Sequence, residues 1–315
     1  MNIYSAENNT IDLAAKQILS GKVIAFPTET VYGLGADATN SKAVEKIYKI
    51  KNRPKNNPLI IHVNSIENAL NFGIFNKSAL KIARKFWPGP LTLVLPSVEN
   101  SPISGFVTSG LRTIAIRIPK NKIARKLIKI VKKPIAAPSA NISGKLSPTQ
   151  AQHVYENFRN NIDMIIDGGA CKLGIESTVI FCSNDSISIL RPGIITLEDV
   201  EETINKKIES NIKNNKVISP GTLKKHYAPK LPIKMNVTSV SPEEALLTFG
   251  KLWPKGSKTT MNLSKNSDLK EAAANLFSML NKLDKSGAKN IAVTKIPNEG
   301  IGVAINDKLK RASEK

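Results

Sequence analysis

Residues 24–63 read IAFPTETVYGLGADATNSKAVEKIYKIKNRPKNNPLIIHV, and their pattern decides the fold. The apolar run 24–26 predicts a strand, which Pro27 ends, and the β-branched run 59–63 predicts a second, buried strand. Between the two strands lie a polar loop at 28–35, with hydroxyls, one carboxylate and two glycines, and then a helix. The order strand, loop, helix, loop, strand indicates an α/β fold.

The helix in this stretch is expected to begin at Asn40 or Ser41, since either side chain caps a helix N-terminus. Lys51, Arg53 and Lys55 follow its end. Ligands of open α/β sheets bind beyond the carboxyl ends of the strands, so these cations predict a site for an anion. Cations at a helix end also interact favourably with the helix dipole, and a solvated, capping cluster is the alternative that the pattern leaves open.

Length and charge narrow the classes of function. The 315 residues are enough for two domains, and 41% of them are hydrophobic, enough for buried cores. The 46 basic and 25 acidic side chains give a net charge of +21, which suits nucleic acid, an anionic surface or a polyphosphate substrate. A compositional bias towards Lys, Asn and Ile is the alternative explanation. Aromatic residues make up 5%, which argues against stacking on single-stranded nucleic acid.

Several chemistries lack their motifs. No apolar run reaches 18 residues and no secretion signal is recognised, so we expect neither a membrane span nor secretion and place the protein in the cytoplasm. Cys171 and Cys182 are expected to be reduced and buried. The three histidines, His62, His153 and His226, lie far apart in sequence, so no protein-held metal is predicted. His153 is expected at the surface, and His62 is open between a structural and a ligand-binding role.

Hydrophobic periodicity predicts further elements in the first 205 residues. Helices are expected at 10–20, with Thr10 as the cap, and at 65–72, 78–86 and 123–131; strands are expected at 91–95, 113–118, 135–137, 164–166, 176–181 and 187–190. Ser147 is expected to cap one more helix, with Pro148 at its first position, and Thr196 to cap a short helix that ends at Ile204.

Polar groups follow two of these strands. Arg117 alternates with Ile116 and Ile118, so its side chain points away from their face. It is either a solvated edge charge or a clamp for a carboxylate, because its fork suits bidentate binding. The small, hydroxyl-rich loop 138–144 either cradles phosphate with backbone N–H groups and serines or is an ordinary turn.

The second half of the chain starts with a change in composition. Residues 205–217 are rich in Lys and Asn with weak periodicity, which indicates a domain boundary. A smaller domain is expected at 231–315. It contains a helical pattern from 269 to 283, a strand at 291–293 and a last helix at 301–311, which together indicate a small α/β layer.

Short motifs recur along the chain in a fixed order: PTETVYGLG (27–35), KNRP (51–54), PLIIHV (58–63), WPGPLTLVL (87–95), APSAN (137–141), ESTV (176–179) and RPG (191–193). Together they resemble the YrdC-like family of threonylcarbamoyl-AMP synthases, over nearly the whole chain. The segment SPGTLKKHYAP (219–229) resembles the linker of the long, two-domain members. Residues 222–224 depart from the Met-Lys-Tyr type of segment found there.

The resemblance implies an open twisted mixed α/β sheet at 1–205, a linker at 206–230 that crosses the active-site cleft, and a smaller Rossmann-like α/β domain at 231–315. It implies an L-threonylcarbamoyladenylate synthase, a nucleotidyltransferase that condenses L-threonine, bicarbonate and ATP to threonylcarbamoyl-AMP and pyrophosphate for tRNA modification. Mg2+ would be held by the substrate. The product would pass to the tRNA threonylcarbamoyl transferase machinery.

The resemblance also assigns residues to the two substrates. L-Threonine would be contacted by Thr30, His62, Arg117, Ala137 (through its backbone) and Ser177. ATP would be contacted by Lys51, Arg53, Asn57, Thr113, Ser139, Ser147, Arg191, His226 and Tyr227. Lys51 and Arg53 are the expected catalytic pair, which would stabilise the negative charge of the transition state.

Two other functions compete with this one. The charge of +21 motivates a double-stranded RNA-binding protein, whose affinity would fall steeply with salt. Related domains also occur in carbamoyltransferases that mature hydrogenases. Those proteins carry an acylphosphatase-like segment and CxxC zinc clusters, and this sequence has neither.

Overall fold

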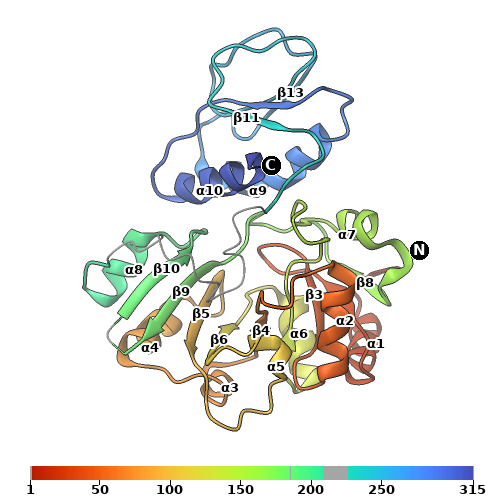
Figure 1. Ribbon diagram of the computed structural model, residues 1–315, viewed down its shortest axis with the longest axis vertical. Helices are drawn as coiled ribbons and strands as arrows, with labels where there is room; N and C mark the ends of the chain where they lie inside the picture. Colours follow the sequence, from red (N-terminus) through yellow and green to blue (C-terminus); the bar gives the residue numbers. More distant parts are fainter. Residues whose placement is uncertain (1, 185, 209–225, 315) are drawn as a thin grey trace.

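The computed structural model describes residues 2–184, 186–208 and 226–314. The described chain contains one sheet of ten strands, which ends at Arg191, and one of four strands, which begins at Ile233. Figure 1 shows the smaller sheet stacked above the larger unit, with the helices labelled α9 and α10 on the side that faces it. The expected open, mixed α/β sheet with a second, smaller α/β unit is confirmed.

The large sheet mixes parallel and antiparallel neighbours. Its spatial order is β1-β8-β2-β3-β7-β4-β6-β5-β9-β10. The pairs β1–β8, β2–β8, β4–β6 and β5–β9 are parallel, and the other neighbours are antiparallel. The strands are β1 (Ile3–Ser5), β2 (Ile24–Phe26), β3 (Gly33–Asp37), β4 (Ile60–His62), β5 (Leu91–Pro96), β6 (Thr113–Arg117), β7 (Ile135–Ala136), β8 (Met164–Asp167), β9 (Thr178–Ser183) and β10 (Ser186–Arg191).

Helices cover the two faces of this sheet unequally. α1 (Asn8–Leu19) and α6 (Lys122–Val131) pack together over β2, β7 and β8. On the opposite face a larger core lies under the other helices. These are α2 (Ser41–Lys51), α3 (Ile66–Leu70), α4 (Lys77–Phe86), α5 (Gly105–Thr108), α7 (Ala151–Phe158), the 3-10 turn η1 (Arg159–Asn161) and α8 (Leu197–Ile204).

Part of the α1 and α6 face carries a small apolar cluster of its own, formed by β4, β5, β6 and β9. Ile61 and Ile116 point into the large core, so Ile60 and Ala115, which belong to the small cluster, point the other way. The same alternation puts His62 and Arg117 on the side of Ile60 and Ala115. This face therefore carries the polar side chains of His62 and Arg117 beside the small apolar cluster.

One predicted loop is partly a strand. The sequence indicated a polar loop at 28–35, but β3 begins at Gly33 and pairs with β2. A Cβ on Gly35 would lie 2.6 Å from the ring of Phe26, so this glycine permits close packing of paired strands rather than a turn. Periodicity did not reveal β3 because its small residues carry almost no apolar pattern.

Two helix caps were predicted correctly. Asn40 caps α2 and accepts a hydrogen bond from the backbone N–H of Ala43. Thr196 caps α8 and forms a reciprocal capping box with Asp199.

Two other helix starts were predicted wrongly. α1 begins after Glu7 rather than at Thr10, and α7 begins after Gln150 rather than after Ser147. The Ser147 hydroxyl instead donates to Oε1 of Glu176, a residue of another segment. A long-range partner thus replaces the local cap that the sequence suggested.

His153 was expected at the surface but is buried on α7. Its Nδ1 accepts the backbone N–H of Thr149, and burial lowers the pKa of its ring. Lys285 of the smaller domain forms an ion pair of 2.6 Å with Glu156 on the same helix. Periodicity within α7 does not reveal its contacts with residues outside the helix.

The second domain is built on a parallel sheet in the order β11-β14-β12-β13. Its strands are β11 (Ile233–Met235), β12 (Ala245–Thr248), β13 (Thr259–Asn262) and β14 (Ile291–Val293), and its helices are α9 (Leu269–Leu283) and α10 (Ile301–Ser313). No helix in the part of the chain that the structure describes is long and apolar enough to cross a membrane. Cys171 and Cys182 are buried and free, as expected.

Apolar contacts join the two domains. Val31, Leu146 and Ile175 of the first domain belong to the same buried cluster as the core of the second. Gly174 approaches α9 so closely that a Cβ would lie 2.4 Å from the carbonyl oxygen of Ala274. The second domain is therefore packed against the first rather than tethered beside it.

Candidate active site

Strand register brings three polar side chains into one row. His62 on β4 is opposite Arg117 on β6, and Arg117 is opposite Thr92 on β5. All three are buried. Partners in register on neighbouring strands lie about 5 Å apart, so the sheet itself sets the spacing of an imidazole, a guanidinium and a hydroxyl.

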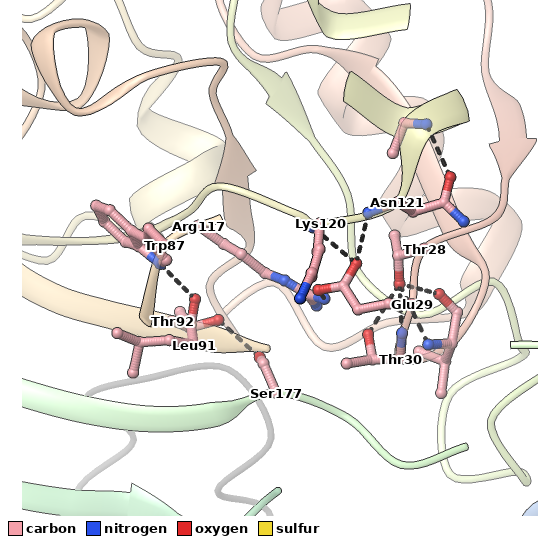
Figure 2. Close-up of polar contacts among 12 residues, drawn as sticks. Thr28, Glu29, Thr30, Trp87, Leu91, Thr92, Arg117, Lys120, Asn121 and Ser177 are labelled. Carbon is pink, nitrogen blue, oxygen red and sulfur yellow. Dashed lines mark hydrogen bonds and ion pairs between the residues drawn. The ribbon is translucent and has the colours of Figure 1, made fainter. Parts of the chain in front are cut away.

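The Arg117 guanidinium is held by a carboxylate from the loop after β2. Its Nη2 donates to Oε1 of Glu29 at 2.6 Å, and Oε2 of Glu29 accepts the backbone N–H groups of Lys120 and Asn121 (Figure 2). Burial raises the pKa of Glu29, but Arg117 and the backbone donors outweigh it, so the net pKa is lowered. Glu29 is thus an anion that fixes one edge of the guanidinium.

Hydroxyl groups line the ends of this row. Thr92 Oγ1 lies 2.7 Å from Ser177 Oγ, and Arg191 on β10 donates through Nη2 to both the carbonyl and the hydroxyl oxygen of Ser177. Thr28 Oγ1 and Thr30 Oγ1 are 2.8 Å apart and close the turn after β2 (Figure 2). Arg191, on the edge strand β10, therefore brings a second guanidinium to the Ser177 hydroxyl.

Two cations come from the end of α2. Arg53 is buried and donates to the backbone and side-chain oxygens of Asn57 and to the carbonyl of Pro58. Lys51 is buried and its Nζ donates to the carbonyls of Ser139 and Asn141. Burial lowers the pKa of both groups, that of Arg53 to about 10, and their mutual proximity lowers the pKa of Lys51 further. The protein concentrates positive charge here at a cost in desolvation.

The segment that leads into the second domain completes the site. His226 is buried, and its ring centroid lies 4.0 Å from that of Tyr227. Burial and the positive charges of Arg53, Lys51 and Arg191 keep the pKa of His226 well below its usual value, so its ring is neutral. The pKa of His62 falls to about 3, through burial and then Arg117. Both histidines are thus neutral hydrogen-bonding groups at neutral pH.

Many of these groups line one cavity, which is partly open to solvent. Its lining comes from Thr28, Val31, Tyr32, Gly33, Arg53, Ile60, His62, Arg117, Ala137, Pro138, Ser139, Glu176, Ser177, Arg191 and His226.

Four polar atoms of that lining are buried without a hydrogen-bond partner in the described chain: His62 Nδ1, Arg117 Nε, Glu176 Oε2 and His226 Nδ1. Native proteins rarely leave buried polar atoms unpaired. Several of them around one cavity indicate a site built for a polar ligand.

Comparisons with known proteins agree with this geometry. The family described as Telomere recombination (Sua5, YciO and YrdC) matches residues 16–193, and the threonylcarbamoyl-AMP synthase C-terminal domain matches residues 195–314. The threonylcarbamoyl-AMP synthase of Pyrococcus abyssi is 40% identical over 96% of this chain and 94% of its own. The chain belongs to the long, two-domain branch of the Sua5/YrdC family.

Further relatives support the assignment over the full length. The threonylcarbamoyl-AMP synthase of Bacillus subtilis is 38% identical and covers 98% of this chain and 94% of its own. The crystal structure of P. abyssi Sua5 complexed with L-threonine superposes with a TM-score of 0.90 at 37% identity, covering 99% of this chain and 98% of that one. Both domains and their arrangement are therefore those of a Sua5-type protein.

The structure brings most of the predicted site residues to the cavity. Those that line it are Arg53, His62, Arg117, Ala137, Ser139, Ser177, Arg191 and His226. Thr30, Lys51, Asn57, Ser147 and Tyr227 stand one contact behind the lining, through Thr28, Ser139, Arg53, Glu176 and His226 respectively.

Thr113 is the first residue of β6 and Arg117 is the last, and Thr113 is half-buried. It lies about 13 Å along the strand from Arg117, four residues at the usual rise. Of the linker motif, residues 219–225 lie outside the described residues.

Three polar residues of the site were not predicted from the sequence. Glu29 pairs with Arg117, Thr92 contacts Ser177, and Glu176 lines the cavity and accepts the Ser147 hydroxyl. Glu29 and Glu176 belong to the PTETVYGLG and ESTV motifs, so a carboxylate inside an otherwise apolar or hydroxyl-rich motif was the available signal. Thr92 sits inside a strand and gave none.

Proposed function

We propose that this protein is an L-threonylcarbamoyladenylate synthase, which condenses L-threonine, bicarbonate and ATP to threonylcarbamoyl-AMP and pyrophosphate. The observation that supports this most directly is the polarity of the cavity. Part of its lining offers Arg117 and His62, which suit an amino acid, and another part offers Arg53, Arg191 and His226, which suit a triphosphate. Ser177, which accepts hydrogen bonds from Arg191, joins the two parts.

L-Threonine is proposed to bind over the β4–β6–β5 row. The Arg117 guanidinium, oriented by Glu29 and with Nε still unpaired, takes the carboxylate. His62, Ser177, Thr30 and the backbone of Ala137 surround the rest of the substrate.

ATP is proposed to bind on the part of the lining that carries Arg53, Arg191 and His226, which is the nucleotide side of the cavity. Arg53, Asn57, Ser139, Ser147, Arg191, His226 and Tyr227 are the proposed contacts, with Lys51 behind Ser139; Thr113 is proposed as a further contact at the far end of β6. Lys51 and Arg53 are the proposed charge-stabilising pair, Arg53 at the cavity and Lys51 through the loop whose carbonyls it holds.

The chemistry asks the protein mainly for positioning. Bicarbonate takes up a proton and loses water to give CO2. The neutral amine of threonine attacks the carbon of CO2 and releases a proton to water, which gives a carbamate. A carbamate oxygen then attacks the α-phosphorus, and the bond to the pyrophosphate oxygen breaks. A site that holds both substrates in line and neutralises the departing pyrophosphate supplies most of the acceleration.

Mg2+ is proposed to arrive with the triphosphate. The described residues contain no group of three or more His, Cys, Asp or Glu side chains that could hold a metal ion. Of the described cavity lining, Glu176 offers a carboxylate oxygen without a partner. One protein carboxylate plus substrate oxygens and water is an ordinary Mg2+ environment, so the residues fit an ion that the nucleotide carries.

The domain boundaries of 1–205, 206–230 and 231–315 are part of the same proposal, with the linker passing over the nucleotide side through His226 and Tyr227. The product is proposed to pass to the tRNA threonylcarbamoyl transferase machinery. The double-stranded RNA-binding alternative is not favoured, since the relatives that match over the full length are named as synthases.

Pyrophosphate release tests the proposal. The protein is incubated with ATP, L-threonine and bicarbonate, and reactions that lack one substrate each serve as controls. We expect release that requires all three. Release without threonine, or none at all, contradicts a synthase.

A further inference from the structure

A lysine of the second domain is buried against the catalytic domain. Lys308 lies on α10, is 1% exposed, and its Nζ donates to the carbonyl oxygen of Pro192 at 2.6 Å. Pro192 directly follows Arg191, which reaches into the cavity to Ser177. A lysine is almost never fully buried unless it is paired. This one is placed where it fixes the segment that carries a cavity arginine.

Lys308 forms an ion pair with Asp307, its neighbour on α10. Asp307 Oδ2 lies 3.3 Å from Nζ, and Asp307 Oδ1 lies 2.9 Å from Arg311 Nε. Burial lowers the pKa of Lys308, and Asp307 opposes that shift. Burying this ammonium group costs desolvation free energy. Its hydrogen bond to Pro192 runs from the second domain to a carbonyl of the first.

Lys308 also stands behind the linker residues. Its Nζ lies 5.9 Å from the ring centroid of Tyr227, which is buried, has φ +65° and stacks at 5.3 Å on Phe277 of α9. A non-glycine residue in this left-handed conformation persists where its surroundings hold it. Tyr227 in turn contacts His226, whose Nδ1 is one of the unpaired atoms of the cavity.

The apolar contacts between the domains end at the same place. Val31, Leu146 and Ile175, which join the core of the second domain, are the chain neighbours of Thr30, Ser147 and Glu176. The second domain therefore packs directly behind three segments that form the cavity. Figure 1 shows α9 and α10 on the side of the second domain that faces the first.

We propose that the second domain holds the nucleotide side of the cavity in its binding geometry and that Lys308 is the positioning residue for this, because it fixes Pro192 beside Arg191 and backs Tyr227 behind His226. The inference rests on the proposed function, since it assigns the second domain a role in ATP binding. Lys308 lies behind the cavity lining and acts through these neighbours.

Lys308→Met tests the inference, because methionine has a similar length without the charge or the donors. The KM for ATP in threonine-dependent pyrophosphate release is expected to rise at least about tenfold, as for loss of a buried, charged hydrogen bond. Lys308→Arg, which keeps the charge and a donor in a different shape, is expected to fall between Met and the wild type. If the Met variant does not fold, the KM for ATP of Lys308→Arg is compared with that of the wild type instead.

Lys285→Met is the matched control. Lys285 also joins the domains, through Glu156 at 2.6 Å, but its side chain is 57% exposed and lies away from the cavity. We expect an unchanged KM for ATP. All assays are run at least 15 °C below each variant's Tm, so that lost stability alone does not change the KM.

Amide hydrogen exchange gives a second readout that needs no activity. In Lys308→Met, exchange is expected to accelerate at residues 191–195 and 226–229, and in Lys285→Met it is expected to match the wild type at both. An unchanged KM for ATP in the Met and Arg variants, or unchanged exchange at both segments, overturns the inference. A wild-type protein without threonine-dependent activity whose Met variant still shows the exchange change refutes the proposed function alone.

Discussion

Replacing Arg117 with alanine should weaken L-threonine binding far more than ATP binding. The Arg117 side chain is 5% exposed and its Nη2 lies 2.6 Å from Glu29 Oε1, while Nε has no partner in the described chain. Truncating one partner of a buried charge pair costs about 2–4 kcal/mol. Arg117→Ala removes the proposed partner of the threonine carboxylate, so threonine binding should weaken about 30-fold to 1000-fold. The KM for ATP should change less than about threefold, because Arg117 is not among the proposed nucleotide contacts.

The fold should survive this change. Glu29 keeps the backbone N–H groups of Lys120 and Asn121 at 3.0 and 3.2 Å, so its carboxylate remains hydrogen-bonded. Threonine affinity is measured by titration calorimetry, and the two KM values by pyrophosphate release. Lys133→Ala serves as the control, because it removes an ion pair of 2.7 Å with Asp37 outside the cavity. Equal increases in both KM values, or unchanged threonine affinity in a folded variant, refute the assignment of Arg117 to the carboxylate.

Three further predictions concern charge, pH and the domain interface. Lys51→Met and Arg53→Met should each lower kcat about 100-fold to 1000-fold, as for loss of a preorganised charge-stabilising group; pyrophosphate kinetics with normal rates would contradict this. The pKa of His62 is about 3 in the folded protein and about 6.5 in the unfolded chain. The neutral ring therefore contributes its full stability above pH 6.5 and loses it as the pH falls towards 3, with about 2 kcal/mol lost at pH 5. Urea unfolding of His62→Gln at pH 7.5 and 5 should show a smaller pH dependence than that of the wild type. Gly174→Ala should lower the free energy of unfolding by about 2 kcal/mol more than Gly287→Ala. Both glycines have positive φ, but the new Cβ at Gly174 would lie 2.4 Å from the α9 backbone, whereas the one at Gly287 would lie in open space. Equal shifts in Tm for the two variants would show that the close approach does not matter.

Local sequence patterns determined elements whose cause is local. The apolar face of α9 and the β-branched residues of β14 fixed these elements at 269–283 and 291–293, as predicted. Asn40 and Thr196 cap their helices through neighbours within three residues. The motif order also identified most of the cavity lining, because a family's binding residues lie in its short polar motifs at the ends of strands.

Tertiary structure alone decided which groups meet. Glu29 and Arg117 are 88 residues apart, and Ser147 and Glu176 are 29 apart, so neither pairing leaves a trace in periodicity or spacing. Lys285 of the second domain pairs with Glu156 on α7 across 129 residues, and Lys308 reaches Pro192 across 116 residues. A sequence records the preferences of each segment for helix, strand or turn, whereas the distance between two side chains and their exposure to water depend on how all segments pack together.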